Sequence, residues 1–375
     1  MKMLIHEQTI DGVVRPIHLS EPEIYADREA EGRSGHVGHG LCEFAPGKII
    51  DFAENTSNVR FKGHSSFGYT EYRISNDYGK TFGEVKILPY SYKTLMDGIY
   101  TIDVEKAVAG TDGSITAVCL RCTQSHEICC EPWDTPMIIR SEDGGKTWSE
   151  PYELCPYKGR TYDAIRYGDA ILILHFCNEG VDRVEGIEGF AGSAPEHVYR
   201  LLRSDDNGKS FYEQCVVPFP DTFGRAYGNL IVREDGSMIA YAYNPKDQYN
   251  MDYVISPDGG KTWTEHGISH VAKRIRNPQV GRLDGQYILH GRAGENEAGS
   301  GAFVFYTSAD GIVWDEGKIL VEGRPACFYS NNLTVRTPDG KERMLVQYSE
   351  NYNDPRPGTW WSAQVNVMHL WVESV

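Results

Sequence analysis

The sequence lacks any apolar run long enough to cross a bilayer, and it has no low-complexity segment or linker. Basic residues are also in short supply, with 37 Lys and Arg against 53 Asp and Glu, so the formal net charge is −16. An acidic protein is repelled by phosphate backbones, which disfavours nonspecific binding to nucleic acid. We therefore expect neither a membrane nor a nucleic acid among its partners. The sequence does not specify the oligomeric state.

Signals for secretion and for metal binding are equally weak. Residues 1–7 lack the apolar core and small-residue cleavage site of a signal peptide, so we expect a cytoplasmic protein or a secreted one whose signal was removed. The nine cysteines form no regular framework, which is typical of a reducing compartment. Cys119 and Cys122 have the spacing of a zinc or redox motif, but alternation along a strand over 115–122 points them to opposite faces. We therefore expect no metal and no cofactor.

What the sequence does contain is one short motif, repeated. Four copies and a shorter fifth occur at Ser75–Phe82, Ser141–Trp148, Ser204–Phe211, Ser256–Trp263 and Ser308–Trp314. In each copy the Asp can accept hydrogen bonds from its own turn, the Gly can take a positive φ, and the aromatic residue can plug the space between neighbouring units. We interpret Asp77, Asp143, Asp206, Asp258 and Asp310 as structural turn residues, not as metal ligands or catalytic acids. Recurrence of this kind predicts a repeat architecture.

A second repeat precedes the first and specifies the architecture. Turn residues between apolar runs predict six hairpins at Phe44–Ile50, Gly110–Ile115, Arg166–Ile171, Arg233–Met238, Arg282–Tyr287 and Arg336–Lys341. Six hairpins followed by five turns predict an all-β fold, a six-bladed β-propeller with four-stranded antiparallel blades, as a single domain over residues 1–375. The blades are expected at about 38–84, 101–150, 162–213, 227–265, 277–316 and 329–374. We expect an N-terminal strand, Lys2 to Thr9, to close the ring by pairing with Val365 to Val372.

This topology predicts where a site would form. The innermost strand of each blade lines a central channel, and polar residues where first strands begin and second strands end would converge at one mouth. The first-strand positions are His36, His39, Asp103, Glu105, Arg160, Tyr162, Asp163, Arg225, Tyr227, Asn229, Arg274, Arg276, Asn277, Gln279, Tyr329, Asn331 and Asn332. The second-strand positions are Glu54, Asn55, Arg60, Ser125, His126, Glu127, His175, Asn178, Glu179, Tyr243, Asn244, His290, Arg292, Glu295, Tyr348, Glu350 and Asn351. Any single one of these residues could instead be a solvent-exposed loop residue with no role in binding. So many polar groups at one mouth nevertheless favour a binding site.

Five such turns on six blades resemble the sialidase (neuraminidase) superfamily with its Asp-box, or BNR, repeats, over residues 33–375. Phe328–Leu333 resembles the segment that carries the sialidase nucleophile, which implies that role for Tyr329. Gln347–Glu350 resembles the segment that follows the nucleophile, and Lys261–His266 resembles the fourth-blade box of bacterial sialidases.

Other positions depart from the family. Sialidases open blade one with Arg-Ile-Pro, whose arginine grips the substrate carboxylate, and this chain has Gly38–Gly40 there. In the family, the fourth blade supplies a Glu that activates the tyrosine and, further on, an Arg. Counting blades along this chain places Tyr227 at the Glu position and Tyr243 at the Arg position. A register shifted by one blade gives Asn277 and Arg292 instead. No register yields the full arginine triad, so we do not expect a standard sialidase.

The resemblance and the polar mouth together predict a sialidase-like glycoside hydrolase for a small oligosaccharide or glycoside, with an acidic sugar as one option. The alternatives are a noncatalytic carbohydrate-binding propeller and a lyase acting beside a uronic acid. A carboxylate pair about 5–10 Å apart would favour hydrolysis, and an Arg–Tyr–His cluster without such a pair would favour a lyase.

We assign roles within this hypothesis. The predicted catalytic residues are Tyr329, Glu350, Asp163 and His39, with Tyr329 as nucleophile and Glu350 as its proton-handling partner. The predicted substrate-binding residues are Arg60, Arg276, Asn277, Arg292, Tyr227, His290 and Asn331. We expect Tyr329, Glu350, His39, Arg60, Asp163, Arg276 and Arg292 to face one cavity on the ring axis.

Overall fold

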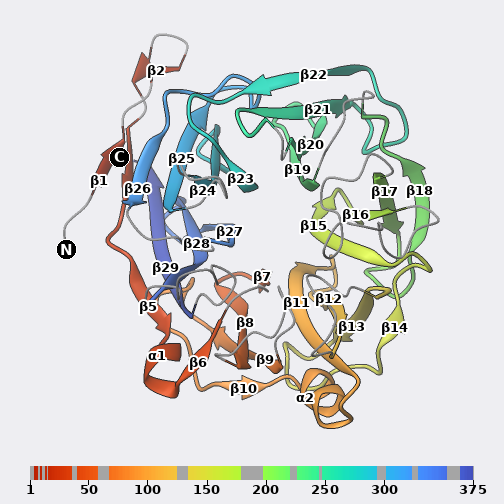
Figure 1. The fold of residues 1–375 in the computed structure, drawn as a ribbon. Helices are drawn as coiled ribbons and strands as arrows, with labels where there is room; N and C mark the ends of the chain where they lie inside the picture. The colour runs from red at the N-terminus through yellow and green to blue at the C-terminus, as the bar shows by residue number, and fades with distance from the viewer. Residues whose placement is uncertain are drawn as a thin grey trace.

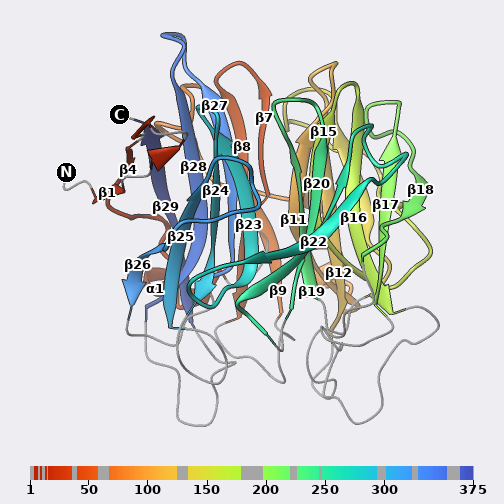
Figure 2. The same ribbon diagram turned by 90° about the horizontal axis from the view of Figure 1, so that it is seen from above.

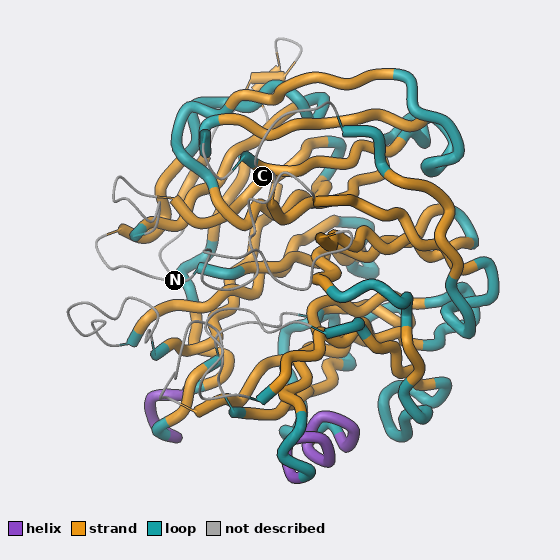
Figure 3. Tube along the Cα trace, turned by 45° about the vertical axis from the view of Figure 1, so that its right-hand side comes forward, coloured by secondary structure: helices purple, strands orange, loops and turns teal. Residues whose placement is uncertain are grey.

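In the computed structural model the described residues are 4–6, 9–10, 13–14, 16–35, 40–57, 67–124, 134–178, 197–219, 226–244, 247–293, 301–322, 328–352 and 364–374. Strands dominate these residues, and the two helices found among them, α1 (Arg28–Glu31) and α2 (Pro89–Met96), lie at the edge of the molecule (Figure 3). The all-β prediction is confirmed.

Six antiparallel sheets stand around a central channel as the blades of a propeller (Figure 1). Blades one to three are β7 (Leu41–Ala45), β8 (Lys48–Ser57), β9 (Gly68–Ser75) and β10 (Lys86–Ile87); β11 (Tyr100–Ala109), β12 (Ile115–Thr123), β13 (Met137–Ser141) and β14 (Tyr152–Glu153); and β15 (Gly159–Tyr167), β16 (Ala170–Asn178), β17 (His197–Ser204) and β18 (Tyr212–Val216). Blades four to six are β19 (Ala226–Val232), β20 (Met238–Tyr243), β21 (Asn250–Ser256) and β22 (Glu265–His270); β23 (Arg276–Leu283), β24 (Gln286–Ala293), β25 (Ala302–Ser308) and β26 (Lys318–Glu322); and β27 (Ser330–Arg336), β28 (Glu342–Asn351) and β29 (Val365–Ser374).

The first strands of the blades form the wall of the channel. β7, β11, β15, β19, β23 and β27 contact one another in a closed circle in that order. Seen at right angles to Figure 1, the strands of the blades run roughly parallel to the channel axis (Figure 2). The predicted six-bladed propeller is therefore confirmed, and its first strands bring together residues that are distant in the sequence.

The ring is closed by a later part of the N-terminal segment than the predicted strand, Lys2 to Thr9. β4 (Ile17–Leu19) and β5 (Glu23–Ala26) both pair with β29, whereas β1 (Leu4–His6) pairs only with the outer side of β4. β2 (Thr9–Ile10) and β3 (Val13–Val14) form a separate hairpin, and β6 (Arg33–Ser34) pairs with the end of β8. The apolar side chains of Ile17 and Leu19 are fully buried in blade six, which explains why this later segment lies next to β29.

Side chains reinforce this seam between blades six and one. The imidazole Nε2 of His369 lies 2.8 Å from a carboxylate oxygen of Asp51, and Gln347 donates to the other oxygen of the same carboxylate. The ring of Tyr25 stacks on His369 at a centroid distance of 3.9 Å. The last blade is thus joined to the first by backbone pairing and by a buried polar contact.

The Asp-box turns lie between the third and fourth strands of their blades, on the outside of the ring. In the second box the Asp143 carboxylate accepts hydrogen bonds from the backbone of Lys146 and Thr147, at 3.0 and 2.9 Å. Gly145 has a φ of 80°, which an L-residue resists. Trp148 packs against Phe52 of the preceding blade at 5.8 Å. The predicted roles of the carboxylate, the glycine and the aromatic plug are all present in this turn.

One consequence of the Asp boxes is an acid-sensitive contribution to stability. Burial acts in the opposite direction, but hydrogen bonds from Ser210 and Ser204 lower the pKa of Asp206 to about 2. A lowered pKa stabilises the fold above the ordinary Asp value of about 3.9 and loses that effect as the pH falls through about 2. We expect Asp206→Ala to lower the free energy of unfolding by about 1–2 kcal/mol at pH 7 and by much less at pH 2.

Urea unfolding of wild type and variant at both pH values would check this expectation. Asp169→Ala is the matched control, because Asp169 is an exposed hairpin residue outside the Asp boxes. Equal destabilisation by Asp206→Ala at pH 7 and pH 2 would show that the carboxylate contributes nothing through its charge.

Candidate functional site

A ring of polar side chains occupies one end of the channel, and every blade contributes to it. We call this set the polar ring; it consists of Glu54, Asp103, Glu105, Arg160, Tyr162, Tyr227, Tyr243, Arg276, Asn277, Arg292 and Tyr329. Apart from the half-buried Arg276, no side chain of the set is more than 6% exposed. Buried polar groups in such number require partners, and here the partners come from the same blade or from a neighbouring one.

Arg160 is the hub of the polar ring. Its guanidinium binds the Glu105 carboxylate through two nitrogens, at 2.7 and 3.1 Å, and donates to the Tyr227 hydroxyl at 3.2 Å. It also lies over the rings of Tyr162, Tyr227 and Tyr329, at 5.2, 5.0 and 5.8 Å from their centroids. Burial opposes the charge, but Glu105 and the tyrosines raise the pKa of Arg160, so the arginine stays cationic.

Blade five supplies two further arginines close to Tyr329. Arg292 donates to the Asn277 side-chain oxygen at 2.9 Å and lies 5.3 Å from the centroid of the Tyr329 ring. Burial again opposes the charge, but Tyr243 and Tyr329 raise the pKa of Arg276. A tyrosine hydroxyl in strongly cationic surroundings is therefore the centre of the site.

A pair of carboxyl groups forms the part of the ring contributed by blades one and two. Asp103 on β11 shares a side-chain hydrogen bond with Glu54 on β8. Burial, followed by the charge of Glu54 and then that of Glu105, raises the pKa of Asp103 well above the usual range. The Oδ1 atom of Asp103 is buried and has no hydrogen-bond partner within the described part of the chain.

The backbone of the first strands is distorted where it carries these side chains. The pairing register shifts between Val104 and Lys106 in β11, between Thr161 and Asp163 in β15, and within residues 226–228 and 276–279 of β19 and β23. The residues at these irregularities include Glu105, Tyr162, Tyr227 and Asn277, all members of the polar ring. A β-bulge redirects a side chain and is frequent beside active sites.

Backbone strain occurs at the same level of the channel. Tyr227 and Asn277 have φ values of 26° and 51°, and Phe328, directly before Tyr329, has 34°. Non-glycine residues rarely adopt positive φ, and where they do they often belong to functional sites. Three successive blades thus carry strained backbone at the polar ring.

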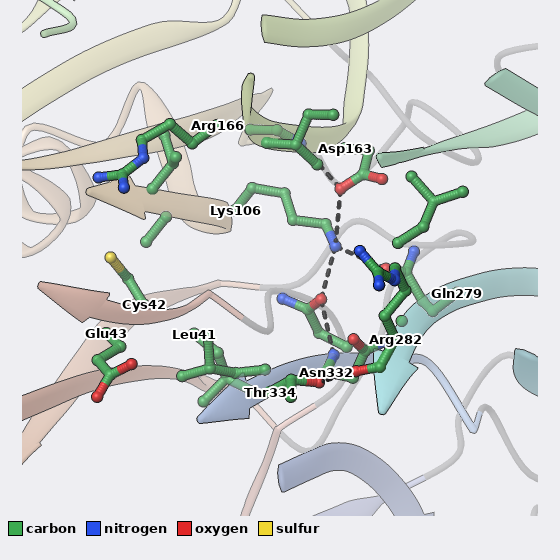
Figure 4. A pocket seen from close by; sticks show the side chains of 18 of the residues that line it. Leu41, Cys42, Glu43, Lys106, Asp163, Arg166, Gln279, Arg282, Asn332 and Thr334 are labelled. Atoms are coloured by element: carbon green, nitrogen blue, oxygen red, sulfur yellow. Dashed lines mark hydrogen bonds and ion pairs between the residues drawn. The ribbon is translucent and has the colours of Figure 1, made fainter. Parts of the chain in front are cut away.

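Below the polar ring a lysine closes the channel. The Lys106 ammonium lies 2.6 Å from side-chain oxygens of Gln279 and Asn331 and 3.2 Å from the Asp163 carboxylate (Figure 4). The other oxygen of Asp163 accepts from the Leu230 backbone at 2.7 Å. We call Lys106, Asp163, Gln279 and Asn331 the channel waist.

Beyond the waist, towards the hairpins that join first and second strands, lies a cavity of about 680 Å³ (Figure 4). Arg166, Arg282 and Arg336 lie along its wall near those hairpins. Two of these arginines are already paired, Arg282 with Glu234 and Arg336 with Glu342, both at 2.8 Å. The polar groups on its floor are satisfied by one another, so this cavity has fewer features of a binding site than the polar ring.

The structure places the predicted site residues at different levels. Tyr329, Arg276, Asn277, Arg292 and Tyr227 belong to the polar ring. His39 and Arg60 lie outside the described residues.

Three other predicted site residues lie at or beside the channel waist. Asp163 and Asn331 bind Lys106 there and do not belong to the polar ring, because the β15 bulge directs Tyr162 to the ring and Asp163 to the waist. His290 lies beside the waist, 2.9 Å from the Ser330 hydroxyl, and burial lowers its pKa to about 3. A neutral, hydrogen-bonded histidine there is a structural element of the channel wall.

Glu350 also has surroundings other than those expected. Its carboxylate accepts a hydrogen bond from the Tyr348 hydroxyl at 3.0 Å. Tyr348 packs on Phe303 of blade five at 4.6 Å, so Glu350 adjoins the interface of blades five and six. The carboxylate that shares neighbours with Tyr329 is instead Glu105, through Arg160 and Tyr162.

The ring residues not chosen from the sequence are Glu54, Asp103, Glu105, Arg160, Tyr162 and Tyr243. Each occupies a first-strand or second-strand position at the predicted mouth, so the positional signal was present. What singles out Glu105 and Tyr162 from their neighbours is the bulge, which no sequence pattern marks.

The described residues lack the features of a metal site and of a membrane-spanning helix. They contain no group of three or more His, Cys, Asp or Glu side chains arranged to hold a metal ion. Cys119 and Cys122 pack into different core clusters, on opposite faces of β12. Neither helix in the described ranges is long and apolar enough to span a membrane.

Similar proteins share this architecture. A protein of unknown function from Dyadobacter fermentans DSM 18053 superposes with a TM-score of 0.69 at 16% identity, covering 95% of this chain and 99% of its own. The Hadza microbial sialidase Hz136 superposes with a TM-score of 0.63 at 15% identity, covering 97% of this chain and 69% of its own. The fold is that of the sialidases.

Sequence similarity to a sialidase is lower but present. A curated sialidase from Paraclostridium sordellii is 24% identical over 251 residues, which is 61% of this chain. The match spans 57% of the length of that relative. No family model matches the sequence. This sialidase-like propeller therefore has its fold in common with sialidases.

Proposed function

We propose that this protein is a sialidase-like glycoside hydrolase that acts on a small glycoside bearing a negative charge, bound at the polar ring. The observation that carries the proposal is the contact of the Tyr329 ring with both Arg160 and Arg292, with Arg276 close enough for its charge to interact with Tyr329. Guanidinium groups bind carboxylates through two parallel hydrogen bonds, so their convergence supports an acidic sugar as substrate.

Tyr329 is the nucleophile in this proposal. Its hydroxyl oxygen forms a bond to the anomeric carbon while the glycosidic oxygen departs with the bonding electrons. Glu105 receives the phenolic proton, because its carboxylate and Tyr329 lie against the same two residues, Arg160 and Tyr162. Water then displaces the tyrosine, which recovers its proton and releases the sugar.

The residue at position 277 supports a reaction that differs from a standard sialidase. The Asn277 amide oxygen accepts a hydrogen bond from Arg292 at 2.9 Å. An amide cannot take a proton from tyrosine at neutral pH, so Asn277 can orient Arg292 but cannot activate Tyr329. We therefore expect sialic-acid glycosides to be cleaved, if at all, below the ordinary enzymatic range of roughly 1–1000 per second.

A panel of chromogenic glycosides and natural acidic oligosaccharides, incubated with the purified protein, tests the proposal. Release of the aglycone from an acidic glycoside, with one water consumed per bond, is the expected result. Fast turnover of a sialic-acid glycoside would refute the distinction from standard sialidases.

The same panel separates the alternative functions. An unsaturated uronic-acid product, detected by its ultraviolet absorbance, would identify a lyase instead. Calorimetric binding of an acidic sugar with no product from any panel member would identify a noncatalytic binding propeller.

A further inference from the structure

We propose that Asp103 is the residue that gives the departing glycosidic oxygen its proton, and that Glu54, on the neighbouring blade, is the positioning residue that holds it. This inference rests on the proposed function and adds the proton donor to it. Glu54 lies on β8 and Asp103 lies on β11, and their side chains meet across the interface of blades one and two.

One carboxyl oxygen of Asp103 lacks a partner among the described residues. The side chain is 5% exposed, on the first strand of blade two, and its Oδ1 atom has no hydrogen-bond partner in the described residues. A buried carboxyl oxygen without a partner is costly, so such atoms need an explanation. A ligand in the polar ring would supply the missing partner, because Asp103 is close enough to Arg160 for their charges to interact.

The carboxyl groups around Asp103 outnumber the guanidinium group beside them. Glu54, Glu105 and Arg160 are all close enough to Asp103 for their charges to interact with it, and Glu105 already forms a two-nitrogen ion pair with Arg160. The remaining two carboxyl groups are buried and in contact, so they cannot both be ionised at modest cost and must share a proton. The raised pKa of Asp103 agrees with this balance.

The carboxyl groups of Asp103 and Glu54 are too close together to lie on either side of a substrate. In retaining glycosidases with two catalytic carboxyl groups, those groups are separated by about 5 Å so that the scissile bond fits between them. Asp103 and Glu54 are in direct hydrogen-bond contact, which leaves no room for a substrate between them. They therefore act as one proton donor on one side of the bond, and Tyr329 is left as the nucleophile on the other.

Asp103 gives up its proton in the first half of the reaction and recovers one in the second. The Asp103 proton moves to the glycosidic oxygen as the bond from that oxygen to the anomeric carbon breaks, and the bonding electrons remain on the oxygen. The alcohol leaves neutral and Asp103 becomes a carboxylate. That carboxylate then takes a proton from the water that attacks the anomeric carbon, which restores the shared proton.

Titration of Asp103 depends on its charged and titratable neighbours. They are Glu54 on β8, Glu105 on β11, Arg160 on β15 and the thiols of Cys119 and Cys122 on β12. Burial raises the pKa of both thiols, so they stay neutral through the working range. Loss of the Asp103 proton should therefore appear as the high-pH limb of the activity profile.

The decisive experiment compares leaving groups. Methyl and dinitrophenyl glycosides of glucuronic acid and of N-acetylneuraminic acid serve as probes for wild type, Asp103→Asn and Glu54→Gln. The methoxy group needs a proton in order to leave as methanol, whereas dinitrophenolate is a stable anion and leaves without one. We expect Asp103→Asn to lower kcat/KM on the methyl glycoside by roughly 10²–10⁴-fold, and on the dinitrophenyl glycoside by less than about tenfold, with loss of the high-pH limb.

Glu54→Gln keeps the contact but removes one charge, so we expect an intermediate loss and a shifted high-pH limb. Asp169→Asn makes the same chemical change on an exposed hairpin and should leave both substrates unaffected. Equal losses on both leaving groups in Asp103→Asn would overturn the proposal, as would an unchanged pH profile.

A readout independent of activity separates this inference from the proposed function. Infrared or carbon NMR spectroscopy of wild type at pH 7 should detect a protonated carboxyl group that disappears in Asp103→Asn and persists in Asp169→Asn. Its absence from wild type would overturn the proton donor even in an active hydrolase. Its presence in a protein that cleaves none of the glycosides would overturn the catalytic role together with the proposed function. Asp103→Asn should still fold, because an amide can donate to Glu54 as the acid does, and thermal melting checks this.

Discussion

Replacement of Tyr329 by phenylalanine is expected to lower kcat on the acidic glycoside by roughly 10³-fold or more, since it removes the nucleophilic oxygen. The substitution deletes one hydroxyl from a side chain that is 4% exposed, and the ring keeps its contacts with Arg160 and Arg292. We therefore expect little change in KM and in melting temperature. Steady-state kinetics and thermal unfolding of the purified variant measure all three quantities.

Tyr92→Phe is the matched control for this substitution. Tyr92 is an exposed residue of α2, 43% accessible, outside the polar ring. The control should retain wild-type kcat. A wild-type rate in Tyr329→Phe would remove Tyr329 from the reaction, and an equal fall in both variants would point to a general loss of active protein.

The second large effect is expected at the channel waist. Lys106→Met should lower the free energy of unfolding by about 3–5 kcal/mol, because it leaves the buried Asp163 carboxylate without its ion-pair partner. The same change also removes the contacts of the ammonium with Gln279 and Asn331, which join blades two, five and six. Guanidinium unfolding at pH 7 measures this loss.

A second variant tests the cause of the destabilisation. Lys106→Met combined with Asp163→Asn removes both charges, so the double variant should recover part of the lost stability. A loss below about 1 kcal/mol in Lys106→Met would mean that the waist contributes little. A double variant less stable than the single one would mean that the unpaired carboxylate is not the main cost.

The fold was predictable because its signals are local. Each Asp box carries its own turn chemistry, as the contacts of Asp143 with Lys146 and Thr147 illustrate. The turns recur in five of the six blades and the hairpins that precede them recur in all six, so counting the hairpins gives the number of blades. The strand that closes the ring was less predictable, since Leu4–His6 and Ile17–Leu19 are both apolar and only packing in blade six selects the second.

The site was predictable only as a set of positions. The rule that first strands begin at the mouth selects both Tyr162 and Asp163, but they differ by one residue and lie on either side of a bulge. The bulge is a tertiary feature, so the sequence cannot assign one residue to the polar ring and the other to the waist. Alternation along β28 similarly places Glu350 beside Tyr348.

Electrostatic partners were the least predictable part. Arg160 binds Glu105, which precedes it by 55 positions and belongs to another blade. Asp103 meets Glu54 across a blade interface in the same way. No periodicity in the sequence connects these residues, and only the closed ring brings them into contact.

The central claim is that Tyr329 attacks an acidic sugar in the polar ring. The most direct measurement is mass spectrometry of the protein after incubation with a fluorinated acidic glycosyl fluoride, whose fluorine slows release of the sugar from the enzyme. We predict one sugar adduct per chain, located by peptide mapping on Tyr329 and absent from Tyr329→Phe. Turnover of the reagent with no adduct, or an adduct on another residue that persists in Tyr329→Phe, would contradict the claim.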